Sequence, residues 1–261
     1  MQRQLHTARG LGARPISVMT VRRRLHRGGL KSRAAAIKPG LTRRHMRLRL
    51  EWGREKREWT RQAWRNCLFC DESRFCLVQE DRTRRVWRRR NERRHDAGLV
   101  NRREAFGGGG LMVWGAIGHN YKSDIIFIQG NLTARRYLDT IIIPQIRPYA
   151  GALGPADFVL VDDNALPHRA EIVNTYLEEE GIQRMDWPPK SPDFNPIENI
   201  WGIMKRSLSR RLRPDHNLRD LRRLISEAWE EIPIETVNRC VRTMNKRARQ
   251  AVENQGSYID F

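Results

Sequence analysis

A chain of 261 residues can form one large domain, or one domain with a small appendage, and can bury a sizeable core. Its formal net charge is +20 at pH 7, and residues 1–50 carry 14 lysines and arginines without one aspartate or glutamate. Such a segment predicts a polyanionic partner, because each phosphate that it neutralises releases condensed counterions. An acidic membrane surface is the alternative, but the sequence has no amphipathic anchor or lipidation signal, so we expect no membrane partner.

Apolar runs and cysteines restrict the class of protein further. No run approaches the roughly 18 apolar residues that span a bilayer, and residues 1–20 lack the apolar core of a secretion signal. The four cysteines, Cys67, Cys70, Cys76 and Cys240, are too few and too clustered for a disulfide framework. Cys67 and Cys70 have the spacing of a metal-binding pair but no second pair, so we predict packing inside a strand, with zinc or redox chemistry as the alternative.

The first predicted element is a short basic helix within residues 15–33, which begins near Ser17 or Thr20 and ends at a pair of glycines. Val21 and Leu25 share one face of this helix, and arginines occupy the others. A cationic helix of this length suits the major groove of DNA, and a solvated basic helix without specificity is the alternative. The candidate DNA-contacting side chains are Arg22, Arg23, Arg24, Arg27 and Lys31.

A linker over residues 34–40 and a long helix over residues 41–64 come next. We expect the large apolar side chains of this helix to dock on the following domain, while its lysines and arginines remain in water. Base stacking is the alternative role for its tryptophans. The docking residues are Leu48, Trp52, Trp59 and Trp64.

From residue 66 the pattern changes to strands. Residues 67–78, 84–89 and 111–118 are predicted as the first, second and third strands of an antiparallel set, and residues 125–129 as a further extended piece. The four glycines of residues 107–110 lack the Lys-Ser/Thr ending of a phosphate-binding loop, so we predict a flexible hinge there.

A separate feature of this region is the arginine-rich stretch of residues 82–94, in which eight of 13 residues are arginine. With Trp87 in its middle, this stretch could follow a phosphate backbone and stack a base. A merely solvated loop is the alternative. Its candidate DNA-contacting residues are Arg88, Arg89 and Arg90.

Helices and strands alternate in the second half of the chain. The predicted helices cover residues 134–149, 168–180, 196–211, 218–231 and 234–253, and the predicted strands cover residues 158–161 and 182–187. The first of these helices has a buried stripe made of Tyr137, Leu138, Ile141, Ile142 and Ile146. Antiparallel strands followed by alternating strands and helices predict an α/β fold with a mixed sheet.

Three acids stand at the ends of different predicted elements. Asp71 lies in the first strand, Asp163 follows the apolar run of residues 158–161, and Glu198 lies in the first turn of a helix. Thirty-four residues separate Asp163 from Glu198. Hard divalent cations prefer oxygen ligands, and two ions about 3.5–4 Å apart stabilise both oxygens of an in-line phosphoryl displacement. The three acids therefore predict a metal-dependent site for phosphoryl transfer.

Each acid has a competitor. Glu72 competes with Asp71, and Asp162 competes with Asp163, because alternation along a strand sends only one of two neighbours towards a site. For Glu198 the alternative is a capping role, in which Asn195 is the N-cap, a proline follows it, and Glu198 is the third helical residue. Helical spacing places Glu198 at the border of a buried stripe, where its side chain can reach a cleft. The stripe consists of Ile197, Ile200, Trp201, Met204 and Leu208.

Three sequence blocks resemble the signature motifs of the Tc/mariner superfamily of cut-and-paste DNA transposases, in its Tc-like branch. They are residues 71–75, Asp-Glu-Ser-Arg-Phe; residues 163–165, Asp-Asn-Ala, with His168; and residues 191–201, Ser-Pro-Asp-Phe-Asn-Pro-Ile-Glu-Asn-Ile-Trp. The resemblance extends from about Ile16 to near the C-terminus. It implies that the catalytic acids and metal ligands are Asp71, Asp163 and Glu198, with His168 and Asn164 as accessory residues.

The resemblance also implies a fold, an activity and partners. The fold is a ribonuclease-H-like catalytic domain, preceded by a partial helix-turn-helix segment that binds DNA. The activity is cleavage of DNA at transposon ends and strand transfer into target DNA at TA sites, with two Mg²⁺ ions for which Mn²⁺ can substitute. The expected partners are double-stranded DNA, as terminal inverted repeats and target, and further copies of the chain in a homodimer or higher oligomer. The expected location is the nucleus.

On this basis we expect four segments. Residues 1–33 form the DNA-binding part, residues 34–65 a linker and docking helix, residues 66–215 the catalytic domain with a clamp-like insertion near residues 79–110, and residues 216–261 the closing helices. The family has a further helix-turn-helix ahead of this one, so we expect an N-terminally truncated member. The alternatives are an immobile, non-catalytic DNA-binding protein derived from a transposon, and a ribonuclease H or other nuclease on the same fold.

Overall fold

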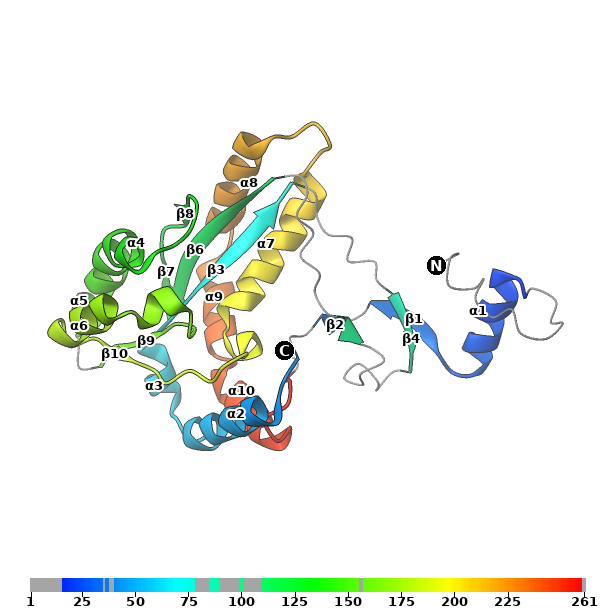
Figure 1. The fold of residues 1–261 in the computed structure, drawn as a ribbon, viewed down its shortest axis with the longest axis horizontal. Helices are drawn as coiled ribbons and strands as arrows, with labels where there is room; N and C mark the ends of the chain where they lie inside the picture. Colours follow the sequence, from blue (N-terminus) through cyan, green and yellow to red (C-terminus); the bar gives the residue numbers. More distant parts are fainter. Residues whose placement is uncertain are drawn as a thin grey trace. The chain divides into compact units, whose positions relative to one another are not determined.

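The computed structural model describes residues 16–34, 36–37, 40–77, 85–89, 99–100, 109–154 and 157–259. The chain divides into two compact units (Figure 1). The smaller unit combines Met1–Pro39 with Asp81–Arg103, and the larger unit combines Gly40–Glu80 with Glu104–Phe261. Each unit is described by itself.

The smaller unit contains the predicted basic helix, α1 (Val18–Arg27). Ser17 caps this helix, because its hydroxyl accepts a hydrogen bond from the N–H of Thr20 at 3.2 Å, and the helix ends at Gly28, followed by Gly29 with φ 76°. Both predicted ends of the helix are therefore confirmed.

Two short strand pairs complete the smaller unit. Strand β1 (Lys31–Ala34) pairs antiparallel with β4 (Arg85–Arg88), and β2 (Ala36–Ile37) pairs parallel with β5 (Leu99–Val100). The predicted linker over residues 34–40 was therefore partly wrong, and β4 is not the second strand of the main sheet. Alternation identified β4 as extended, but pairing is a long-range property that alternation does not specify.

The larger unit is built on a sheet in the order β10-β9-β3-β6-β7, with β8 also paired to β6. Strand β3 lies at its centre, antiparallel to β6 and parallel to β9. The strand that carries Asp71 and the strand that precedes Asp163 are therefore neighbours in the sheet. The strands are β3 (Cys67–Cys76), β6 (Gly110–Gly118), β7 (Tyr121–Lys122), β8 (Ile126–Ile128), β9 (Val159–Val161) and β10 (Gln183–Arg184).

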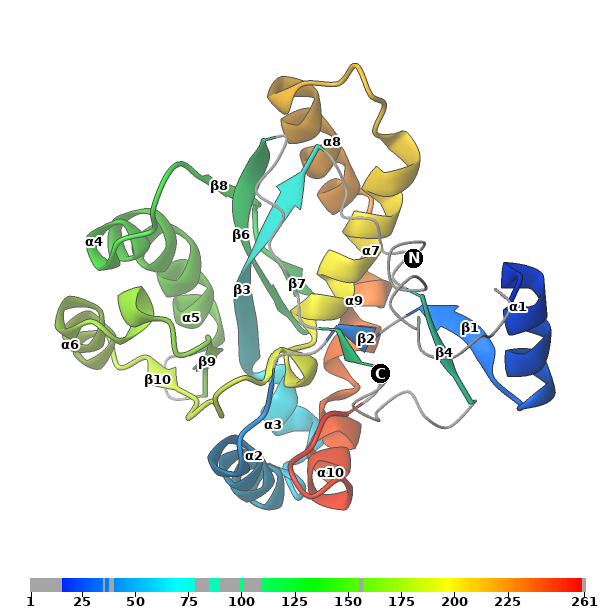
Figure 2. The same cartoon turned by 45° about the vertical axis from the view of Figure 1, so that its right-hand side comes forward.

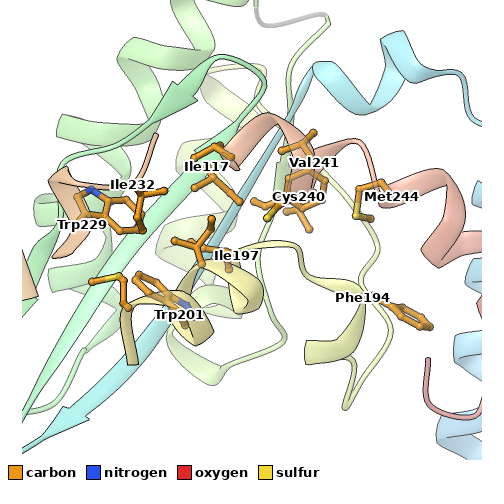
Figure 3. Packing of buried hydrophobic residues seen from close by; sticks show 14 of the residues in the cluster. Ile117, Phe194, Ile197, Trp201, Trp229, Ile232, Cys240, Val241 and Met244 are labelled. Carbon is orange, nitrogen blue, oxygen red and sulfur yellow. The ribbon is translucent and has the colours of Figure 1, made fainter. Parts of the chain in front are cut away.

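Helices cover both faces of this sheet. Figures 1 and 2 show α4 (Ala134–Tyr137), α5 (Arg147–Leu153) and α6 (Glu171–Glu179) on one side, and α7 (Ile197–Arg211), α8 (Leu218–Glu230) and α9 (Ile234–Val241) on the other. A separate apolar core lies under each layer, and Figure 3 shows part of the core under α7–α9. Cys67 belongs to that core and Cys70 to the other, so the two thiols lie on opposite faces of β3, where they pack as predicted.

The predicted helix over residues 134–149 is longer and less regular than expected. Between α4 and α5 lies η2 (Leu138–Ile146), a widened π-type segment that contains Pro144. Proline lacks an N–H and cannot complete the ordinary α-helical ladder, which favours such a local change. All five residues of the predicted buried stripe are buried.

The predicted long helix over residues 41–64 is two helices, α2 (Arg43–Lys56) and α3 (Arg61–Arg65). Helix α2 has its C-cap at Arg57. Thr60 is the N-cap of α3, since its hydroxyl accepts a hydrogen bond from the N–H of Ala63 at 3.1 Å. Trp52 and Trp64 are buried as predicted, whereas Arg49, expected in water, has no exposed surface.

The C-terminal half follows the prediction with changes at element boundaries. The helix expected over residues 168–180 begins as the short turn η3 (Leu166–Arg169), and the one expected over residues 234–253 is divided into α9 and α10 (Met244–Glu253). The five predicted apolar residues of α7 are all buried: Ile197, Ile200, Trp201, Met204 and Leu208. Within the described part of the chain, no helix is long and apolar enough to cross a membrane.

Candidate active site

Two neighbouring parallel strands position two of the predicted acids. Phe69 of β3 is paired with Val161 of β9, so Asp71 and Asp163, each two residues further along, leave the same part of the sheet. On the other side of β3, Asp71 is paired with Gly115 of β6. The centre of the sheet therefore holds Asp71 between β9 and β6.

A side-chain amide fastens the start of α7 to the strand that carries Asp71. Asn195 donates from Nδ2 to the carbonyl of Cys70 at 3.1 Å, and its Oδ1 accepts from the N–H of Ile197 at 3.2 Å. One residue thus binds both the backbone just before Asp71 and the first N–H of the helix that carries Glu198. The N-cap of this helix is Pro196, and not Asn195 as the capping alternative had it.

The capping alternative for Glu198 is not supported by the backbone. The N–H of Asn195, which a capping glutamate would bind, donates to the carbonyl of Pro192 at 3.0 Å. Glu198 is half-buried at the border of the apolar stripe of α7, as the helical spacing predicted.

The pKa of Asp71 depends on the charges of the other two acids. Burial raises the pKa of the Asp71 carboxyl well above its usual value, and the negative charges of Glu198, Glu72 and Asp163 raise it further. The indole N–H of Trp201, which donates to Oδ2 of Asp71 at 3.1 Å, acts in the opposite direction. Acids from three distant parts of the sequence therefore lie close enough for their charges to act on Asp71.

The donor set fits a hard divalent cation in its chemistry. Carboxylate oxygens are the ligands that Mg²⁺ and Mn²⁺ prefer, and a cation would relieve the repulsion that raises the pKa of Asp71. Among the described residues, no three histidine, cysteine, aspartate or glutamate side chains approach closely enough to enclose one ion.

His168 lies between two of the acids. The imidazole is almost fully buried, with Nδ1 2.9 Å from Oδ1 of Asp163 and Nε2 3.3 Å from Oε1 of Glu72, and its ring packs on Tyr137. Burial alone would lower the pKa of His168, but the two carboxylates outweigh burial and raise it to about 10. Burial likewise opposes ionisation of Asp163, yet His168, the N–H of Ala165 and the charge of Arg169 lower the pKa of this carboxyl. His168 is thus a cation that holds Asp163 ionised beside Glu72.

The neighbouring acid Asp162 has a structural role. It is 1% exposed, and its carboxylate forms ion pairs with Arg169 at 2.7 Å and Arg184 at 3.4 Å. Asn164 is also held on both sides, since Nδ2 donates to the carbonyl of Trp187 and Oδ1 accepts from Arg169. Asp163, with a side chain 54% exposed, is the one of these two acids that faces solvent.

Trp201 is a contact of the site that sequence reasoning placed only in the core. It follows Glu198 by three residues, hence on a nearby part of α7, and its ring is 1% exposed and stacks on Trp229. A Cβ at Gly115 would come within 2.9 Å of this ring, so glycine opposite Asp71 makes room for it. Figure 3 shows the two tryptophans together in the core. The spacing between Glu198 and Trp201 was the signal that could have predicted this contact.

If the acids catalyse the DNA cleavage that the resemblance implies, replacing Trp201 by phenylalanine should slow it about tenfold or more, because a hydrogen bond to a charged group is worth roughly 1.5–3 kcal/mol. Trp229→Phe is the matched control, since the Trp229 indole donates at 2.8 Å to the carbonyl of Ser123 and not to an acid. Single-turnover cleavage rates of both variants, measured below their melting temperatures, provide the comparison. If Trp201→Phe and Trp229→Phe cleaved at equal rates, the hydrogen bond from Trp201 to Asp71 would not contribute to the reaction, and Trp201 would have only a packing role.

The predicted DNA-contacting residues belong to the smaller unit. Arg22, Arg23, Arg24, Arg27 and Lys31 are all exposed, and so is Arg89. The side chain of Arg88 and the whole of Arg90 lie outside the described residues. Trp87 is half-buried and contacts the ring of His26 edge-on, with centroids 5.2 Å apart. The DNA contacts of these residues stay a prediction.

Comparisons with known proteins identify the family of this chain. Residues 66–222 match the family described as "DDE superfamily endonuclease", and residues 1–58 match a family described as "Transposase". The chain is 30% identical over 240 residues to the transposable element Tcb2 transposase of Caenorhabditis briggsae, covering 92% of this chain and 86% of that protein. The chain belongs to the Tc1/mariner family of DDE transposases.

Solved structures of a mariner transposase confirm the fold of this Tc1/mariner member. The Mos1 transposase paired-end complex with left transposon end gives a TM-score of 0.69 at 18% identity, covering 94% of this chain and 72% of that one. The Mos1 catalytic domain gives a TM-score of 0.62 at 16% identity, covering 86% of this chain and all of that one. Further Mos1 paired-end complexes are described with Mn and with Mg. The predicted ribonuclease-H-like catalytic domain and the transposase helix-turn-helix region are therefore confirmed.

Proposed function

We propose that this chain is a cut-and-paste DNA transposase whose catalytic residues are Asp71, Asp163 and Glu198. It hydrolyses phosphodiester bonds at transposon ends, and the freed 3′-hydroxyl then attacks target DNA at the same site. The observation that carries this proposal is the placement of the three acids: Asp71 and Asp163 each lie two residues beyond the paired Phe69 and Val161, and Asn195 fastens the start of the Glu198 helix to the carbonyl of Cys70. Membership of the DDE endonuclease superfamily supports the reaction class.

The metal ligands would be Asp71, Asp163 and Glu198, which would hold two Mg²⁺ ions, or Mn²⁺ in their place. Such ions, when bound, neutralise charge that develops on the attacking and leaving oxygens. The residues around the acids keep them in place. Trp201 donates to Asp71, and the cationic His168 holds Asp163. No side chain is needed as a covalent nucleophile.

The substrate and assembly follow from the relatives. Mos1 structures contain paired-end complexes with a transposon end, so we propose that two or more copies of this chain bind terminal inverted repeats as double-stranded DNA. The exposed arginines of α1 suit the phosphate backbone and the major groove. By family resemblance the target is a TA dinucleotide, and the place of action is the nucleus.

The test uses a duplex that carries the inverted repeats flanking the coding sequence, incubated with Mg²⁺ or Mn²⁺. Wild type should cut at the repeat ends, and Asp163→Asn should lose about 10³-fold or more in rate, because the metal supplies several kcal/mol of transition-state stabilisation. Asp162→Asn is the matched control. Among the described residues, the carboxylate that it removes pairs with Arg169 and Arg184 and with no other cation, so the substitution should lower the melting temperature and leave cleavage within about tenfold of wild type.

Two results would contradict this assignment. Equal cleavage by wild type and Asp163→Asn would exclude Asp163 from the reaction. Tight, salt-dependent binding to the repeat without nicking in either metal would identify a DNA-binding protein that has lost the reaction.

A further inference from the structure

Two arginines of the larger unit have no exposed surface. Arg49 lies on α2 and Arg247 on α10, and both fall outside residues 66–222, the part of the chain that matches the endonuclease family. A buried guanidinium is costly unless its donors are bonded, because it exchanges its hydration for protein contacts. The partners of these two side chains therefore indicate what they stabilise.

Arg49 binds the loop that precedes the Glu198 helix. It forms a two-pronged ion pair with Asp193, at 2.6 Å and 2.5 Å, and donates to the hydroxyl of Ser191 at 2.9 Å. Its guanidinium also lies over the ring of Phe194, 4.0 Å from the centroid. On its other side, Nε donates to the carbonyl of Gly256 at 2.8 Å, so Arg49 connects this loop to the C-terminal tail.

Arg247 binds the same segment further along. It donates to the carbonyl of Asp193 at 2.8 Å and to Oδ1 of Asn199 at 2.6 Å, and Thr243 accepts from its Nε at 2.7 Å. Asn199 is the residue directly after Glu198. The pKa of Arg247 is lowered to about 9 by burial, against the opposing influence of Cys240, Asp193 and Glu198, so Glu198 lies within range of its charge.

Together the two arginines fix both sides of the short path that leads to Glu198. Arg49 holds the 191–194 turn, Arg247 holds the 193–199 stretch, and Asn195 fastens its middle to the backbone of Cys70, beside Asp71. These contacts restrict the first turn of α7. Arg49 and Arg247 bind the loop, Asn195 binds the strand, and the turn therefore has little freedom to move away from Asp71.

We infer that Arg49 and Arg247 are positioning residues for the third acid, and that they set the distance from Glu198 to Asp71 through the loop of residues 190–199. This inference rests on the proposed function, in which Glu198 is a metal ligand. It extends the catalytic machinery to α2, α10 and the C-terminal tail, which contribute no acid themselves. A catalytic segment without these elements would keep all three acids and lack the contacts that hold the third.

The experiment compares Arg247→Lys and Asn199→Ala with wild type, in the full chain. Lysine keeps the positive charge but cannot reproduce a forked set of bonds, and Asn199→Ala removes one partner of Arg247 without burying a new group. Arg249→Ala is the matched control, because Arg249 lies on the same helix, two residues away, and is exposed. Glu198→Gln reports the loss of the acid itself.

Two readouts are used on protein that retains its circular dichroism spectrum. The first is Mn²⁺ binding without DNA, followed by the electron paramagnetic resonance signal of free Mn²⁺. The second is the Mn²⁺ concentration that gives half-maximal cleavage of the repeat duplex. We expect Arg247→Lys and Asn199→Ala to weaken Mn²⁺ binding at least fivefold and to shift the cleavage midpoint by a similar factor. Arg249→Ala should match wild type.

The outcomes separate this inference from the proposed function. If Glu198→Gln weakens Mn²⁺ binding and abolishes cleavage while Arg247→Lys and Asn199→Ala behave as wild type, the positioning role is wrong and the proposed function stands. If Glu198→Gln changes neither readout, Glu198 is not a ligand and both fail. A shift of the same size in Arg249→Ala would also overturn the inference, because a change at an exposed residue of α10 would then have the same effect as loss of the Arg247 contacts.

Discussion

Replacing Asp71 by asparagine should abolish DNA cleavage and, in the same protein without metal, raise the melting temperature. The carboxyl pKa of Asp71 is raised in the folded state by burial and by Glu198, Glu72 and Asp163, so folding disfavours the ionised form. The folded protein then holds this proton more tightly than the unfolded chain, and its contribution to stability falls as the pH rises above the unfolded pKa. Asparagine removes the charge and can still accept the bond from Trp201.

We expect a rise of a few degrees in metal-free buffer at pH 7.5, since 1 kcal/mol corresponds to about 2–4 °C in a protein of this size. Cleavage should fall about 10³-fold or more. Added Mn²⁺ should stabilise wild type, because a ligand that binds only the folded state raises its stability, and should stabilise the variant far less. Differential scanning fluorimetry with and without Mn²⁺ measures all three melting effects.

Asp215→Asn is the control for charge. Asp215 is exposed in the loop between α7 and α8, and its replacement also removes one negative charge from a chain of net charge +20. Removing an acid from such a chain increases self-repulsion and should lower stability slightly. If Asp71→Asn raises the melting temperature and Asp215→Asn leaves it unchanged or lowers it, the effect at Asp71 comes from repulsion by the neighbouring acids. A lower melting temperature for Asp71→Asn would show that the acids do not repel one another in the folded protein.

The strands of the central sheet were predictable from local pattern, but the choice of acids was not. Alternating or continuous apolar runs identified β3, β6 and β9, and apolar residues at helical spacing identified the buried stripe of α7. Local pattern left Glu72 open beside Asp71, and Asp162 open beside Asp163. The choice of Asp71 and Asp163 came from the resemblance to the Tc/mariner motifs.

The contacts that hold the acids were not predictable in this way. Arginine is typical of the solvated face of a helix, so nothing in the sequence indicated that Arg49 and Arg247 are buried. Their burial depends on Asp193 and Asn199, which lie 144 and 48 residues away along the chain. The indole bond from Trp201 to Asp71 likewise joins residues 130 apart. Hydrophobic periodicity predicts which face of an element is buried, but it does not predict which polar group a buried side chain will meet.

The C-terminal tail provides the second large effect, because Gly256 leaves no room for a side chain. Its φ is 72°, and a Cβ built on it would lie 1.8 Å from the carbonyl oxygen of Met46 on α2. Gly256→Ala should therefore destabilise the protein by about 3 kcal/mol or more, through backbone strain of about 1 kcal/mol and displacement of the tail. The melting temperature should fall by roughly 6–12 °C.

Gly130→Ala separates these two contributions. Gly130 also has a positive φ, 65°, but a Cβ there would meet nothing within 4 Å, so alanine adds the backbone strain alone. We expect a fall of about 2–4 °C for this variant, measured in the same thermal unfolding experiment. Because the carbonyl of Gly256 accepts from Arg49, which also holds Asp193, displacing the tail should loosen the loop before Glu198 as well as lower stability. Equal melting temperatures for the two variants would mean that the tail does not dock on α2 in solution.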